Sequence, residues 1–174
     1  MKQLILISGK RSSGKSYVSE KISKKFGYTH FEMSKIAKEL RAYDNKTQFH
    51  LRKYVSKKHK KNGKSFLMCH LLKKIALSSE KKIIVSGIRH IEEVKCIPKE
   101  VFEVKWYYIY DTFISRLVKV INRKDRSSII EFFIEEYYSN KWGDYILRKN
   151  SVLIDKRIGI KALLQIETLL KVDK

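Results

Sequence analysis

The stretch Gly9-Lys10-Arg11-Ser12-Ser13-Gly14-Lys15-Ser16 decides the fold of this chain. An apolar run of strand length, from Gln3 to Ser8, comes directly before it. After it, Val18, Ile22 and Phe26 recur at helical spacing among polar residues. The sequence therefore predicts a strand, a glycine-containing loop and a helix in direct succession.

The spacing G-x-x-x-x-G-K-S is the P-loop pattern, and its residue types suit a polyphosphate. Glycines let the backbone curl so that successive N–H groups face the phosphates, and the helix N-terminus adds partial positive charge. Lys15 can reach the β- and γ-phosphates of a nucleotide, and the Ser16 hydroxyl can ligate Mg²⁺. The expected nucleotide-binding residues of this segment are Gly9, Lys10, Arg11, Ser12, Ser13, Gly14, Lys15, Ser16 and Tyr17. A glycine turn that merely joins a strand to a helix is the alternative explanation.

The composition is that of one globular domain. Of the 174 residues, 43% are apolar and 33% are charged, which is typical of a chain that buries about two-thirds of its unfolded surface. No apolar run approaches the length of a membrane span, and the N-terminal apolar stretch is too short for a signal peptide. Cys69 and Cys96 lack the spacing of a redox or zinc pair, so we expect buried thiols and a cytoplasmic protein.

Basic residues far outnumber acidic ones. There are 39 Lys and Arg residues against 18 Asp and Glu residues, which gives a net charge of +21. A field of this sign attracts nucleic acid, anionic lipid or small polyphosphates. A lysine-rich composition spread over solvated faces, such as an A/T-rich genome produces, is the simpler explanation. The charge therefore supports an anionic substrate without naming one, and nucleic acid stays an alternative partner.

Strand-like and helix-like segments alternate along the rest of the chain. Expected strands cover residues 3–8, 28–33, 83–86, 101–110 and 151–154. Expected helices follow the loop and cover about 35–42, 47–61, 65–79, 91–97, 112–122, 128–138, part of 140–148, and about 163–170, with Ser34 as the N-cap of the helix at 35–42. This alternation predicts a single domain over residues 1–174 with a three-layer α/β/α P-loop NTPase fold and a five-stranded parallel sheet.

Ligands of such sheets bind at the carboxyl ends of the strands. The segments that close the expected strands are the P-loop, Met33-Ser34, Ser86-Gly87-Ile88-Arg89, Tyr110-Asp111 and Asp155-Lys156-Arg157. We expect the functional site among these segments.

Several stretches resemble the small P-loop kinases that phosphorylate phosphorylated metabolites. The segment from Ser8 to Glu20 looks like the P-loops of phosphomevalonate kinases and phage deoxynucleotide kinases. The segment from Ile84 to Val94, I-V-S-G-I-R-H-I-E-E-V, is similar to the V-x-D-G-I-R-x-x-E-E-V of archaeal dephospho-CoA kinase-like proteins. Ser151 to Asp155, ahead of a leucine-rich helix, is similar to their closing strand and loop. The group also includes nucleoside and deoxynucleoside monophosphate kinases, and the resemblance implies ATP and Mg²⁺ as cofactors.

The resemblance implies roles for particular residues. Arg89 would grip the acceptor's phosphate or organise the transferred one. Acceptor-binding helices would span about residues 34–79, with Ser34 and Arg52 in the acceptor cleft, and the adenine would lie near Asp155. A lid over about residues 116–138 would bring arginines onto the ATP phosphates, and the arginines of that region are Arg116, Arg123 and Arg126. The catalytic residues expected from the resemblance are Lys15, Arg89, Arg123 and Arg126, although exposed basic turns are often only solvated.

The chain departs from this group at the end of its third expected strand. Ser86 and Gly87 stand where the relatives place an aspartate that helps to hold Mg²⁺. Ser16 could act with water ligands alone, or Glu32 at the end of the second strand could substitute as a metal ligand. A third alternative is that catalysis is lost and the loop only binds nucleotide.

The sequence thus predicts an ATP-dependent phosphotransferase of a small phosphorylated acceptor, with a nucleoside or deoxynucleoside monophosphate first. Dephospho-CoA and phosphomevalonate are the next candidates. A basic nucleotide-dependent protein that binds RNA or DNA is the alternative from another class. The basic run from Lys57 to Lys61 and the aromatic run from Trp106 to Tyr110 could serve such binding. We interpret the first as a solvated helix face and the second as sheet residues.

Overall fold

β1 (Lys2–Ser8) is the central strand of a five-stranded parallel sheet with the order β2-β3-β1-β4-β5. The structure, a computed structural model, describes residues 1–122, 126–141, 143–155 and 168, and leaves the side chains of residues 126–128, 140, 141 and 155 undescribed. The other strands are β2 (Thr29–Glu32), β3 (Lys82–Ile88), β4 (Phe102–Tyr110) and β5 (Val152–Asp155). The predicted five-stranded parallel α/β fold is therefore confirmed.

Helices cover both faces of the sheet because its central strand is apolar on both sides. Ile5 and Ile7 of β1 pack in one core cluster with Val18 and Ile22 of α1 (Lys15–Phe26). The even-numbered residues of β1 face the opposite core, which is formed with helices α2 (Met33–Tyr43), α4 (Phe66–Ala76), α5 (Ile91–Lys95) and α8 (Asp144–Lys149). Among the described residues, no helix is long and apolar enough to cross a membrane.

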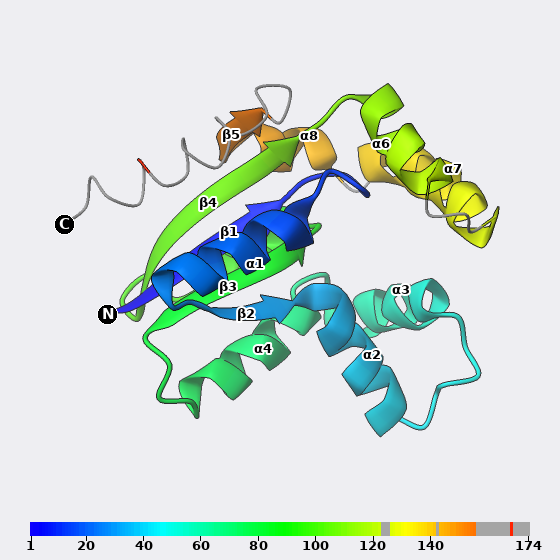
Figure 1. Cartoon of the computed structure of the whole chain (residues 1–174). Coiled ribbons are helices and arrows are strands. Elements are labelled where there is room, and N and C mark those ends of the chain that lie inside the picture. Colours follow the sequence, from blue (N-terminus) through cyan, green and yellow to red (C-terminus); the bar gives the residue numbers. More distant parts are fainter. Residues whose placement is uncertain (123–125, 142, 156–167, 169–174) are drawn as a thin grey trace.

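The three remaining helices lie where the strands end. They are α3 (Leu51–Asn62), α6 (Phe113–Ile121) and α7 (Arg126–Lys141). Figure 1 shows them on the side of the sheet toward which the arrowheads of β1, β3 and β4 point. The carboxyl ends of the central strands are consequently bordered by helices from two distant parts of the sequence.

Most predicted elements occur in the structure, with shifted ends. The helix expected at 47–61 begins only at Leu51, and the helix expected at 65–79 covers Phe66–Ala76. Ser34 is not an N-cap as expected, because β2 runs straight into α2 and Glu32 takes the capping position. The Ser34 hydroxyl instead donates to a Glu32 carboxylate oxygen at 2.5 Å. The helix expected near 163–170 lies outside the described residues.

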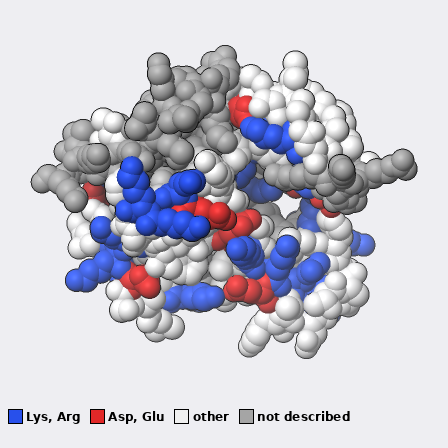
Figure 2. Space-filling view, in the orientation of Figure 1, with Lys and Arg blue, Asp and Glu red and all other residues white. Residues whose placement is uncertain are grey.

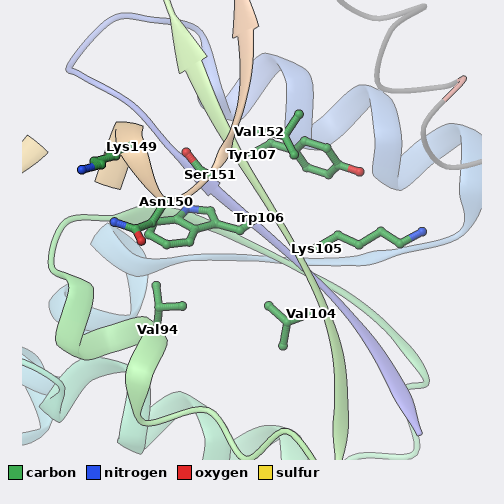
Figure 3. A pocket seen from close by; sticks show the side chains of 9 residues that line it. All are labelled: Val94, Val104, Lys105, Trp106, Tyr107, Lys149, Asn150, Ser151 and Val152. Atoms are coloured by element: carbon green, nitrogen blue, oxygen red, sulfur yellow. The ribbon is translucent and has the colours of Figure 1, made fainter. Parts of the chain in front are cut away.

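The aromatic run of β4 belongs to the sheet, as interpreted from the sequence. Tyr107 and Tyr108 are buried, and the indole N–H of Trp106 donates to the Ser8 hydroxyl at 3.0 Å. Figure 3 shows Trp106 on the wall of a groove between β4, α5 and the α8–β5 connection. Among the predicted site residues whose side chains are described, none lines this groove, whose volume is about 640 Å³.

The two cysteines lie next to each other although they are far apart in the sequence. Both are free and half-buried, not fully buried as expected. The Cys96 thiol donates to the Glu93 carbonyl oxygen at 3.3 Å, and burial together with the Cys69 thiol raises the pKa of Cys96 to about 12. Cys96 is accordingly an unreactive thiol at neutral pH.

The close approach of the P-loop to β4 gives a test of the fold. Gly9 has a φ of +140°, and a Cβ at this position would lie 2.5 Å from the Ile109 carbonyl oxygen. Gly9→Ala should lower the free energy of unfolding, measured by urea denaturation, by about 3 kcal/mol. The control is Gly27→Ala, because Gly27 has a φ of +70° and a ψ of 35°, in the left-handed helical region, with nothing within 4 Å of the added Cβ. It should cost only about 1–2 kcal/mol, and equal losses in the two variants would refute the packing argument.

Candidate phosphate-binding site

The P-loop wraps around the N-terminus of α1 and leaves polar groups turned toward its centre. Gly14 takes the N-cap position with a φ of +88°, in the left-handed region that glycine favours. The Lys15 ammonium donates to the carbonyl oxygens of Gly9 at 2.8 Å and Lys10 at 2.7 Å. The buried hydroxyls of Ser12 and Ser13 have no hydrogen-bond partner among the described residues. Such a loop still has donors to offer to an oxygen-rich ligand.

Lys15 is held in an environment that disfavours its own charge. Burial and, to a smaller extent, the nearby Arg89 guanidinium lower the pKa of its ammonium to about 7, although Glu135 and Asp144 oppose the shift. The residues around Lys15 therefore do not supply enough negative charge to stabilise its ammonium form fully. A polyphosphate in the loop would supply it.

A large cleft opens beside the P-loop and contains most of the predicted site residues. Its volume is about 1330 Å³, and it lies between the P-loop, α2, α3, the end of β3 and α7. Predicted residues that line it are Arg11, Ser12, Gly14, Lys15, Ser16, Tyr17, Glu32, Ser34, Arg52 and Arg89. Figure 2 shows Lys and Arg side chains around a hollow of the visible face, with Asp and Glu side chains among them.

Three other predicted residues cannot be placed in this cleft. Arg123 lies outside the described residues, as do residues 156 and 157, which follow Asp155 in the expected adenine region. The side chains of Arg126, at the start of α7, and Asp155, at the end of β5, are also outside the described part. Their roles stay predictions.

Three arginines from separate elements converge on one carboxylate of α7. Arg11 of the P-loop lies 3.3 Å from a Glu135 oxygen, and Arg89 at the end of β3 lies 3.3 Å from the other. Arg52 of α3 is 3.5 Å away. Burial alone would raise the pKa of the Glu135 carboxyl, but the three guanidinium groups bring its pKa below the usual value. The convergence marks a site built for an anion.

The acidic residues of α7 were not identified from the sequence. Besides Glu135, Glu131 binds Arg11 at 2.8 Å, and Glu136 binds Lys10 at 2.6 Å. Glu131 and Glu135 are one helical turn apart and so share a face. Two glutamates four residues apart are unusual in so basic a chain, and this spacing could have indicated a helix face that pairs with arginines. From the sequence, only the arginines of this region were considered.

Arg116 acts as a link and not as a free lid arginine. Its side chain is 2% exposed and binds Glu136 at 2.8 Å. It also donates to the backbone carbonyl oxygen of Arg11 at 3.3 Å. Arg116 thereby joins α6 to both α7 and the P-loop, which a buried and fully paired guanidinium does well.

The end of β3 carries no carboxylate at the position that the resemblance emphasised. Ser86 is buried, and its hydroxyl is hydrogen-bonded to the His30 ring nitrogen Nε2 at 2.8 Å. Burial lowers the pKa of His30, so its imidazole is neutral at pH 7. Among the described residues, no group of three or more His, Cys, Asp or Glu side chains could hold a metal ion. Mg²⁺ is usually held by one or two carboxylates together with substrate phosphates and waters. Ser16 and Glu32 both line the cleft, and their role as Mg²⁺ ligands stays a prediction.

Glu93 positions the turn that carries Arg89. One of its carboxylate oxygens accepts hydrogen bonds from the backbone N–H groups of Arg89 at 2.8 Å and His90 at 3.0 Å. Glu93 is 2% exposed, and burial raises its pKa to about 7 despite these donors. The buried carboxyl therefore fixes the backbone direction from which Arg89 enters the cleft.

Comparison with known proteins gives the fold its context. No family model matches the sequence, and no curated protein is significantly similar to it. Solved structures do share its fold. TT1252 from Thermus thermophilus has a TM-score of 0.68 at 13% identity, covering 99% of this chain and 97% of that one. Shikimate kinase from Aquifex aeolicus has a TM-score of 0.59 at 16% identity, covering 98% and 97%.

An uncharacterized protein from Eubacterium ventriosum also shares the fold, with a TM-score of 0.60 at 14% identity and coverage of 98% and 99%. The chain thus has the α/β fold of P-loop kinases such as shikimate kinase. At these identities the likeness establishes the fold alone. The narrower resemblance to nucleoside monophosphate, dephospho-CoA or phosphomevalonate kinases stays a prediction.

The buried Glu93 carboxyl predicts a pH-dependent contribution to stability. Its folded pKa of about 7 lies above the usual value of 4.5. Its contribution is therefore complete below the unfolded pKa and is lost as the pH rises through the folded pKa. Because glutamine does not titrate, the free energy of unfolding of the wild type relative to Glu93→Gln should fall by about 3 kcal/mol from about pH 5 to about pH 8. Urea denaturation across this range measures it, and parallel curves would contradict the assignment.

Proposed function

We propose that this chain is an ATP-dependent phosphotransferase that acts on a small phosphorylated acceptor. The observation that carries the proposal is the convergence of Arg11, Arg52 and Arg89 on one anionic group beside the P-loop. These guanidinium groups come from the loop, from α3 and from the end of β3. A nucleotide-binding loop by itself needs no arginines from two further elements.

The arrangement suits the chemistry of phosphoryl transfer. An acceptor oxygen forms a bond to the γ-phosphorus while the bond between that phosphorus and the ADP oxygen breaks, so the enzyme mainly positions the reactants and stabilises charge. The P-loop N–H groups and Lys15 would hold the donor phosphates. Mg²⁺, held by Ser16 and Glu32 with water, would neutralise phosphate charge when bound. Arg11, Arg52 and Arg89 would hold the phosphate of the acceptor beside the P-loop.

The wall of the cleft formed by α2 and α3 favours a phosphorylated acceptor. Cations that line the cleft besides the three converging arginines and Lys15 are Lys38, Arg41, Lys53, Lys57 and Lys60. Leu51, Val55 and Leu67 add apolar surface that suits the uncharged part of an acceptor. Nucleoside and deoxynucleoside monophosphates combine a phosphate with such a part, and we place them first. Dephospho-CoA and phosphomevalonate are the next acceptors to test.

A coupled ADP-release assay with ATP and Mg²⁺ tests the proposal directly. The panel contains nucleoside and deoxynucleoside monophosphates, dephospho-CoA and phosphomevalonate. We expect ADP release that depends on one class of acceptor. If ADP appears at the same rate without any acceptor, and RNA or DNA binds with a steep salt dependence, the chain is a nucleotide-dependent nucleic-acid-binding protein and the proposal fails.

The lowered pKa of Lys15 predicts how ATP binding responds to pH. In the free protein this pKa is about 7, and the phosphates of ATP raise it, because they stabilise the ammonium form. ATP binding should therefore take up a proton above pH 7, and the affinity should fall by up to about tenfold per pH unit there. Calorimetry in buffers of different ionisation enthalpy measures both effects. Lys15→Met should abolish the proton uptake, whereas a pH-independent affinity in the wild type would rule out this role.

A further inference from the structure

We propose that the Glu135 carboxylate occupies the binding site of the acceptor's phosphate in the unliganded protein. A phosphorylated acceptor must then displace this carboxylate to bind. α7 then carries a built-in competitor that sets the affinity for the acceptor. The identity of the displacing ligand rests on the proposed phosphotransferase function. The competition itself rests on the geometry around Glu135.

The first support is the way in which Glu135 satisfies its partners. Its two oxygens serve three guanidinium groups at 3.3 to 3.5 Å, and its side chain is 15% exposed. Guanidinium groups bind carboxylates and phosphates in the same planar, bidentate manner. A phosphate brings more oxygens and more negative charge than a carboxylate. It would therefore satisfy the three arginines better than Glu135 does.

The second support is that ion pairs make most of the contacts between α7 and the P-loop side of the cleft. On one side of Glu135, Glu131 binds Arg11 and lies 3.5 Å from His50. On the other side, Glu136 binds Lys10 and Arg116. Ion pairs of this kind weaken when another anion competes for the same cations.

Apolar side chains on the outer surface of α7 add little to the packing of this helix. Its apolar side chains there are open to solvent, since Ile130 is 64%, Phe133 51% and Tyr137 61% exposed. Among the described side chains of α7 only Phe132 is fully buried, and Phe132 and Phe133 pack against Phe113 of α6. An element with few buried apolar contacts separates from its neighbours at low cost. Displacement of Glu135 by a ligand is therefore compatible with the fold.

A catalytic role for Glu135 fits the same surroundings less well. It could replace the aspartate that is missing at Ser86, either as a metal ligand or as a base. Three adjacent guanidinium groups lower its pKa, which makes it a poor proton acceptor. The same positive charges would repel Mg²⁺. A competitor for phosphate is the role that these charges favour.

The test uses inorganic phosphate as the probe and needs no turnover. Phosphate-dependent thermal stabilisation is compared for the wild type, Glu135→Gln and a matched charge control, Glu39→Gln. Glu39 is 59% exposed and pairs with Lys74 on α4 at 3.2 Å, away from the cleft. We expect Glu135→Gln to bind phosphate about tenfold or more tightly than the wild type. In the variant the three arginines no longer have to separate from a carboxylate before phosphate can bind. Glu39→Gln should bind like the wild type, and equal or weaker binding by Glu135→Gln would overturn the inference.

A measurement on the wild type keeps the inference testable if Glu135→Gln does not fold. Phosphate alone should speed amide hydrogen exchange in residues 129–139 of α7 and leave exchange in β1 unchanged. Slower or unchanged exchange in α7 would contradict displacement.

If phosphate displaces Glu135 but no acceptor supports ADP release, the proposed function fails and the competition stands. If acceptors are phosphorylated but Glu135→Gln leaves the acceptor KM unchanged or raised, the competition fails and the function stands.

Discussion

Positive charge gathered at the carboxyl ends of β1 and β3 has to be balanced by an anion. Arg11, Arg52 and Arg89 would repel one another and Lys15 if nothing negative lay between them. In this structure the balance comes from Glu135 of α7. Glu135 also opposes the lowering of the Lys15 pKa, which burial and Arg89 cause, and it lines the cleft beside the P-loop. The same charges support the proposed binding of a phosphorylated acceptor.

The parts of this arrangement that depend on local sequence could be predicted. The run of apolar residues before Gly9, the glycines of the loop and the periodic residues after Ser16 each determine their own backbone conformation. Strong β-favouring runs likewise predicted the five strands, and their parallel direction brings their carboxyl ends to one edge of the sheet. Arg89 was expected at this edge because it follows the third strand, whereas Arg52 was assigned to the acceptor cleft by the resemblance alone, and both line the same cleft as the loop.

The parts that depend on contacts between distant residues could not be predicted. Glu135 meets Arg11 across 124 positions of sequence, and no local pattern shows which of several acidic residues will reach the loop. Arg116 was assigned to a lid over phosphates, but its burial against Glu136 follows from how α6 and α7 pack. The start of α2 was misplaced at Ser34, because a strand that runs directly into a helix leaves no separate capping residue.

A phosphotransferase of the proposed kind transfers a phosphoryl group in this basic cleft and does not merely hold a nucleotide there. Phosphorus NMR of the protein incubated with ATP, Mg²⁺ and an acceptor mixture follows the γ-phosphoryl group itself. The account predicts that the γ-phosphoryl signal of ATP decreases while a signal from a newly phosphorylated acceptor grows in proportion to ADP. Growth of the inorganic phosphate signal alone, or no change in ATP, would contradict it.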